Sequence, residues 1–69
     1  MNEVFFNDSG RDCHVLKRDG ERTLIYMPTN QFTPFVVPLI HKQGETSWYH
    51  GIYCHTLDEA LREYDKRTN

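Results

Sequence analysis

The fold is decided by one stretch of sequence, SWYHGIYCHTLDEALREY, which runs from Ser47 to Tyr64. Residues 47–54 alternate in side-chain character, which predicts a β-strand, and the residues after them repeat apolar side chains at helical spacing. The two halves meet at a recognisable helix start. We therefore expect the rest of the chain to pack against this strand and helix.

The helix is predicted to begin near Leu57. Thr56 and Glu59 form a capping-box pattern, in which the hydroxyl accepts from the Glu59 amide and the carboxylate accepts from the Thr56 amide. Apolar side chains follow at i, i+3, i+4 and i+7, and they are Leu57, Ala60, Leu61 and Tyr64. One helix face is therefore expected to be buried. A helix this short is marginal alone, so the preceding strand must hold it.

The predicted strand carries aromatic residues on both faces. Strand geometry gives one face Trp48, His50, Ile52 and Cys54, and the other Ser47, Tyr49, Gly51 and Tyr53. Two tyrosines flanking a glycine indicate a covered face, a β-bulge at the glycine, or a close approach by another backbone. Small domains also place tyrosines on half-exposed sheet faces without any partner. This is nevertheless the most partner-like surface in the sequence.

A β-hairpin is predicted upstream, because two strand-like runs, 12–18 and 21–27, flank the dipeptide Asp19-Gly20, which suits a two-residue type I′ turn. With those two residues as the loop, facing residues have numbers that sum to 39. The core face is then expected to hold Cys13, Val15, Leu24 and Tyr26. The tip carries the basic residues Lys17, Arg18 and Arg22, with Lys17 and Arg22 on the same side.

The remaining strands complete the predicted fold. Val4-Phe5-Phe6 is a short first strand, stopped by a turn-forming cluster at 7–10. The run from Phe35 to His41 contains Pro38, which lacks an amide donor, so this strand is expected at a sheet edge or with a bulge. The predicted class is α+β: a small twisted antiparallel sheet of four to five strands with one C-terminal helix packed on one face.

Composition limits the possible functions. The 69 residues form at most one domain (1–69), with 38% hydrophobic residues and a net charge of −2. Mixed charge disfavours nucleic acid or an acidic membrane as the main partner, and no apolar run is long enough to cross a membrane. The N-terminal residues lack a signal-peptide pattern, so a cytoplasmic location is expected, with both cysteines as thiols.

The chain contains candidate residues for a metal site and for an active site. Thiolate and imidazole are the ligands that zinc prefers, and the chain offers Cys13, His14, His50, Cys54 and His55. Their spacing follows no CxxC or HxxxH pattern, so neither a metal nor another cofactor is expected. Cys54, just before the helix, is a candidate nucleophile, and His41, Lys42 and His50 are a candidate acid–base set. Nothing in the spacing fixes their geometry, so the chain is predicted not to be an enzyme.

Protein recognition is the predicted function that needs the fewest assumptions, because it requires only a sheet edge or an aromatic face. The candidate partner-binding residues are Trp48, Tyr49, Tyr53, Phe35 and Val37, from the aromatic surface and the predicted sheet edge. The partner is expected to be a larger protein, and a homodimer through a sheet edge is a further option. The alternative is a nucleic-acid-binding protein that uses Lys17, Arg18 and Arg22 or an aromatic sheet face. The third predicted function is that of a metal-binding domain.

The segment from Thr56 to Leu61, after a strand, resembles the helix entry of HicB-like antitoxins, whose partial RNase H-like fold binds a toxin. The likeness covers about a quarter of the chain, and the Pro-rich, Gly-Cys stretch of that family is missing before the helix. In size and compactness the chain is also similar to small phage and mobile-element proteins that block host defence nucleases. These resemblances imply an inhibitor or antitoxin-like protein that occupies a surface of a larger protein.

Overall fold

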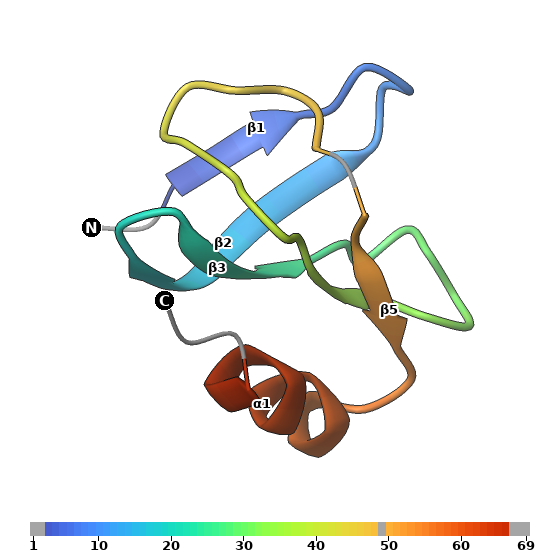
Figure 1. Ribbon diagram of the computed structural model, residues 1–69. Helices are drawn as coiled ribbons and strands as arrows, with labels where there is room; N and C mark the ends of the chain where they lie inside the picture. The colour runs from blue at the N-terminus through green and yellow to red at the C-terminus, as the bar shows by residue number, and fades with distance from the viewer. Residues whose placement is uncertain (1–2, 49, 67–69) are drawn as a thin grey trace.

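The computed structural model describes residues 3–48 and 50–66, and it contains one antiparallel sheet and one helix (Figure 1). The strands and the helix are β1 (Glu3–Phe6), β2 (Asp12–Asp19), β3 (Arg22–Tyr26), β4 (Phe35–Val37), β5 (Ile52–Cys54) and α1 (Leu57–Lys66). Strand order in the sheet is β1-β2-β3-β4-β5, so every strand pairs with its sequence neighbour in a meander. The predicted α+β fold with a C-terminal helix on the sheet is confirmed.

The start of α1 agrees with the predicted capping box. The Glu59 amide donates to Thr56 Oγ1 at 3.2 Å, and the Thr56 amide donates to Glu59 Oε1 at 3.4 Å. The same carboxylate oxygen also accepts from the His55 amide at 2.9 Å. These bonds satisfy amide groups that have no partner within the helix, which fixes its start at Leu57.

Each face of the sheet carries a hydrophobic core. The helix-side core contains Leu24, Val37, Cys54, Ala60 and Tyr64. The opposite, loop-side core contains Cys13, Val15, Ile25, Met27 and Val36, with Phe5 and Trp48 packed against it. The loop segment 38–48 supplies the cover of this second core, and in Figure 1 it passes beside β1 at the top while α1 lies below the strands. A covered second face is one of the explanations that the aromatic strand pattern allowed.

The predicted strand over 47–54 is wrong for its first half, because β5 begins only at Ile52. Ser47 and Trp48 belong to the loop, and His50 has a φ of 53°, which is uncommon for a residue other than glycine. That left-handed residue breaks the alternation of an extended strand. The predicted division of 47–54 into two strand faces therefore fails before Ile52.

The hairpin turn lies one residue later than predicted, at Gly20-Glu21, because Asp19 pairs with Arg22. Gly20 has a φ of 65°, and Glu21 has no positive φ, as in a type II′ turn with glycine first. A bulge between Val15 and Lys17 shifts the register further along β2. The predicted pairing sum of 39 is therefore wrong.

The new register changes the composition of the core face. Val15 faces Ile25 rather than Leu24, and Tyr26 faces His14 rather than Cys13. Leu24 therefore joins the helix-side core instead of packing with Cys13. A one-residue slip moves each side chain of a strand to the other face, and this is the effect seen here on β3.

The strand β4 is not a sheet edge, contrary to the prediction. It pairs with β3 on one side and with β5 on the other. Pro38 is compatible with this position because β4 ends at Val37, so the ladder never requires an amide from the proline. The edges of the sheet are β1 and β5.

One charged network joins the first two strands to the covering loop. Arg18 on β2 binds both carboxylate oxygens of Glu3 on β1, through Nε to Oε2 and through Nη2 to Oε1 at 2.8 Å. Its Nη1 donates to the His41 carbonyl at 2.7 Å, and its Nη2 lies 3.0 Å from His41 Nδ1. The Arg18 and Glu3 side chains are only 17% and 23% exposed. We call these three residues the Arg18 network.

His41 is fully buried within this network. A guanidinium group only donates, so His41 Nδ1 must accept, and its proton therefore sits on Nε2, which donates to the Glu45 carbonyl at 3.0 Å. The imidazole stacks on Phe5 with ring centroids 5.2 Å apart and meets Trp48 edge-on at 5.9 Å. The network thus fixes the loop that carries Trp48.

Replacing Arg18 with methionine is expected to destabilise the fold by about 3 kcal/mol, because Glu3 and His41 keep their burial but lose their charged partner. Urea unfolding followed by circular dichroism measures the loss. Arg11→Met, at an exposed position, is the matched control and should lie within about 0.5 kcal/mol of the parent. Equal stability of the two variants would contradict a structural role for the network.

Candidate functional site

Trp48 lies between two hollows of the surface. The polar pocket has a volume of about 150 Å³ and is lined by Asn7, Asp8, Ser9, Thr46, Ser47, Trp48 and Tyr53. The apolar groove has a volume of about 580 Å³ and is lined by Leu39, Ile40, Lys42, Glu45, Ser47, Trp48 and His50. The two hollows share Ser47 and Trp48, so together they form one candidate site on either side of Trp48.

Phe5 and Gly51 pack against the indole of Trp48 and hold it in place. Its ring meets Phe5 edge-on with centroids 6.4 Å apart. A Cβ atom built on Gly51 would lie 2.8 Å from Trp48 Nε1 and 2.8 Å from Val36 Cγ2. Gly51 is therefore needed for the close approach of the indole. The sequence predicted a close approach by another backbone, whereas the approaching atoms belong to the side chains of Trp48 and Val36.

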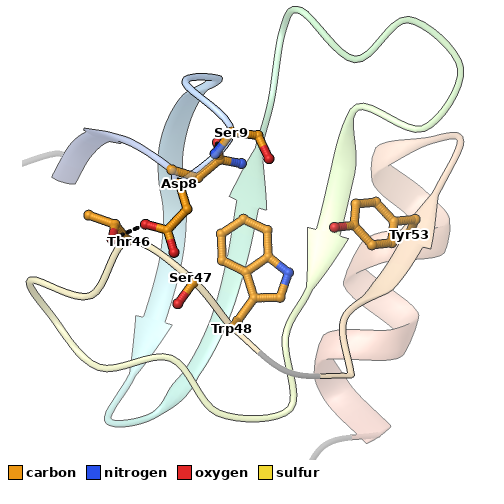
Figure 2. Close-up of a pocket in the computed structure, with 7 residues that line it drawn as sticks. Asp8, Ser9, Thr46, Ser47, Trp48 and Tyr53 are labelled. Atoms are coloured by element: carbon orange, nitrogen blue, oxygen red, sulfur yellow. Dashed lines mark hydrogen bonds between the residues drawn. The ribbon is translucent and has the colours of Figure 1, made fainter.

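The polar pocket has a rim fixed by hydrogen bonds. The Asp8 amide donates to the Thr46 carbonyl at 3.1 Å, and Thr46 Oγ1 donates to Asp8 Oδ1 at 2.7 Å. Asn7 Oδ1 accepts from the amides of Ser9 and Arg11, both at 2.9 Å. Figure 2 shows Asp8 and Thr46 on one side of the indole and Tyr53 on the other, with the tyrosine hydroxyl directed toward it. The pocket therefore presents acceptor oxygens beside an aromatic ring.

The apolar groove exposes hydrophobic side chains. Leu39 and Ile40 are 50% and 49% exposed, although both lie next to the half-buried Trp48. Their loop is held by the His41 amide, which donates to the Glu21 carbonyl at 3.1 Å, and by the Lys42 amide, which donates to Glu45 Oε1 at 2.9 Å. These side chains are therefore exposed on an anchored loop.

The predicted partner-binding residues divide into three groups. Trp48 and Tyr53 come together at the polar pocket. Phe35 is half-buried against the helix-side core, and Val37 is fully buried, so the predicted edge contact through these two residues is wrong. Tyr49 lies outside the described residues.

Sequence reasoning missed the polar half of the site. Asp8 and Thr46 are 38 residues apart, and no local pattern connects them. Leu39 and Ile40 belong to the run that was assigned to a strand, yet they follow Pro38 directly. Because Pro38 ends the strand, two consecutive apolar residues after it were a usable signal for an exposed apolar loop.

The basic hairpin tip is engaged within the fold. Arg18 belongs to the network described above, and the Arg22 guanidinium lies 4.4 Å from the centroid of the Tyr64 ring. Arg22 also donates to the Tyr64 carbonyl at 3.3 Å and to Asp19 at 3.2 Å, while Lys17 Nζ lies 5.0 Å from the same ring. Lys17 and Arg22 do share one side, as predicted, but they contact α1 there.

The candidate metal ligands do not come together. Cys13 lies in the loop-side core and Cys54 in the helix-side core, so the sheet separates the two thiols. Across residues 3–48 and 50–66, no three histidine, cysteine or acidic side chains are close enough to hold a metal ion. In the same part of the chain no helix is long and apolar enough to span a membrane.

Both thiols have a raised pKa. Burial raises the pKa of Cys54 above its ordinary value of 9.0, and the carboxylates of Glu59 and Glu63 raise it further. Burial also raises the pKa of Cys13, with a smaller contribution from Asp12 and an opposing hydrogen bond from the Asn7 backbone. A nucleophilic cysteine needs a lowered pKa, so the environment of Cys54 is opposite to what that role requires.

No protein-family model, curated protein or solved structure matches this chain. The resemblance to HicB-like antitoxins therefore rests on the helix entry alone.

Gly51→Ala is expected to displace Trp48 and to destabilise the fold by about 1–3 kcal/mol, because the added methyl group overlaps the indole and Val36. Trp48 is the single tryptophan, so its fluorescence emission reports the displacement directly. Ser47→Ala, at an exposed position of the same loop, is the control and should leave both emission and stability unchanged. An unshifted emission maximum in Gly51→Ala would contradict the close approach.

Both thiols are expected to resist alkylation at neutral pH in the folded chain and to react fully in denaturant, because burial keeps them protonated. Mass spectrometry of iodoacetamide-treated Cys13→Ser and Cys54→Ser variants assigns each rate. A raised folded-state pKa contributes stability below pH 9.0 that is lost as pH rises through the folded value. Rapid labelling of native Cys54 at neutral pH would argue for an activated thiol instead.

Proposed function

We propose that this chain is a small, non-enzymatic protein-binding module that acts by occupying a surface of a larger protein. The observation that carries the proposal is the pair of exposed apolar side chains, Leu39 and Ile40, beside Trp48 in the apolar groove. Large hydrophobic side chains on an anchored loop, next to a pocket with hydrogen-bonding groups, are typical of the centre of a protein interface.

The chemistry of the site favours a protein partner. Tryptophan and tyrosine are enriched among residues that dominate binding energy, because they bury large area at little entropic cost. Here the oxygens of Asp8 and Thr46 lie on one side of the Trp48 ring and Tyr53 lies on the other (Figure 2). The fitting partner surface inserts an aliphatic or aromatic side chain into the apolar groove and a donor, such as an amide or ammonium group, into the polar pocket.

The mechanism in this proposal is steric. Binding at the Trp48 site covers a surface that the larger protein uses, which is how an inhibitor or antitoxin-like protein in the cytoplasm acts. The raised thiol pKa values and the engagement of Arg18 and Arg22 in internal bonds support binding of a protein over catalysis or nucleic-acid recognition. No covalent step is required.

The test is a comparison of two variants. Leu39→Ser with Ile40→Ser removes the apolar side chains of the groove, and Phe32→Ser removes a more exposed ring, 82% accessible, that lies outside the site. Immobilised parent and control should capture the same protein from a host lysate after nuclease treatment, and the groove variant should not. With the purified partner, the groove variant is expected to bind roughly 10- to 100-fold more weakly by calorimetry.

Capture that is equal for the parent and the groove variant would overturn the assignment of this site. Capture that disappears with nuclease treatment would instead favour the alternative, a nucleic-acid-binding protein. Circular dichroism of each variant establishes that the fold is retained before the binding results are compared.

A further inference from the structure

The strand β1 has one side without a neighbouring strand, because in the described chain it pairs with β2 alone. Among the described residues, the covering loop bonds to this part of the backbone only beyond the end of the strand, where the Asp8 amide donates to the Thr46 carbonyl at 3.1 Å. Proteins usually protect such an edge with a charged side chain, a proline or a bulge. The only charge on β1 is Glu3, and Arg18 binds both of its carboxylate oxygens on the loop side of the sheet. That charge therefore does not protect the edge.

The same strand exposes two large apolar side chains on one face. Val4 is 56% exposed and Phe6 is 67% exposed, and both point to the helix side of the sheet, opposite to Phe5. The helix α1 packs against β3, β4 and β5 and leaves the β1 end of this face uncovered. Val4 and Phe6 thus form an apolar strip at a sheet edge, which we call the β1 strip.

The β1 strip continues a row of side chains that crosses the whole sheet. Val4 faces His14, His14 faces Tyr26, and Tyr26 faces Phe35. The rings of His14 and Tyr26 have centroids 6.2 Å apart, and those of Tyr26 and Phe35 have centroids 5.2 Å apart. The row runs from the helix-side core outward and stops at the open edge. Among the described residues, no strand continues this row beyond β1.

We infer that two copies of this chain associate through antiparallel pairing of β1 with the β1 strand of a second copy. A two-fold axis perpendicular to the sheet keeps the helix side of both copies on one face, so facing residues have numbers with an even sum. A sum of 10 places Val4 opposite the partner's Phe6, and Phe6 opposite the partner's Val4. A sum of 12 places Phe6 opposite the partner's Phe6 but Val4 opposite the partner's Asp8. Of these two registers, the sum of 10 gives both apolar side chains an apolar neighbour.

Charge and area are consistent with this register. Glu3 faces the partner's Asn7, so no like charges oppose each other, and Glu3 keeps its bond to Arg18. An aromatic side chain buries roughly 200 Å², so the exposed part of Phe6 offers about 130 Å² per copy. With Val4 and the strand backbone added, the area over both copies stays below about 1,000 Å², which is the range of weak, transient contacts. The expected dimer is weak, with a dissociation constant in roughly the micromolar range.

Sedimentation equilibrium of the parent chain tests the inference. The average mass should rise from one copy toward two as concentration increases from about 10 µM to about 1 mM. Phe6→Lys should remain monomeric across this range, because it places an exposed charge on the edge. Phe32→Lys is the matched control, since it removes a still more exposed ring in the β3–β4 loop, and it should dimerise like the parent.

Cross-linking tests the register. Cross-strand neighbours have Cβ atoms about 5 Å apart, within reach of a disulfide. Val4→Cys mixed with Phe6→Cys should form the mixed disulfide faster than either variant forms its own, while Cys13 and Cys54 stay buried and reduced. A parent chain that is monomeric at every concentration overturns the inference, and so does a dimer that Phe6→Lys leaves unchanged.

Discussion

The structure depends on one guanidinium group. Arg18 joins β1 through Glu3 and the covering loop through the carbonyl and ring of His41, so three segments converge on a single side chain. The loop is also bound through the His41 amide to Glu21 and through Thr46 to Asp8, but Arg18 is the side chain that binds β1 and the loop at once. Without Arg18, the rings of Phe5 and Trp48, which pack around the buried imidazole, would lose their common support. The candidate site is therefore positioned by residues that take no part in it, and its geometry follows from a network on the inner side of the loop.

The parts of the fold that local patterns encode were predictable. The capping box at Thr56 and the periodicity after it use residues three or four apart, so the start of α1 at Leu57 follows from the sequence. The hairpin was predictable only in outline, because the turn uses Gly20 in its first position and a bulge after Val15 shifts the pairing. Neither choice has a distinct sequence signal. The position of β4 inside the sheet depends on long-range pairing, and Pro38 was a misleading sign because it lies just outside the strand.

The candidate site was predictable by composition but not by arrangement. The density of aromatic residues pointed to Trp48 and Tyr53, which do meet at the polar pocket. Arg18 looked like a solvated residue at a hairpin tip, yet its partners Glu3 and His41 are 15 and 23 residues away. Contacts at such separations leave no periodic trace in the sequence, and the left-handed φ of His50 leaves none either. For this reason the sequence indicated two aromatic residues that line the polar pocket, but it did not indicate their faces or their neighbours.

The two ends of α1 are held in different ways. Its first turn is capped by its own neighbours, Thr56 and Glu59, whereas the carbonyl of Tyr64 in its last turn accepts from Arg22 on the hairpin. The ring of Tyr64 also lies beneath the cations of Lys17 and Arg22. The first turn is thus capped by residues next to it in the sequence. The last turn is bonded to a segment more than 40 residues earlier in the chain. Fraying of the last turn therefore reports the integrity of the hairpin, so amide exchange near Tyr64 monitors a remote part of the molecule.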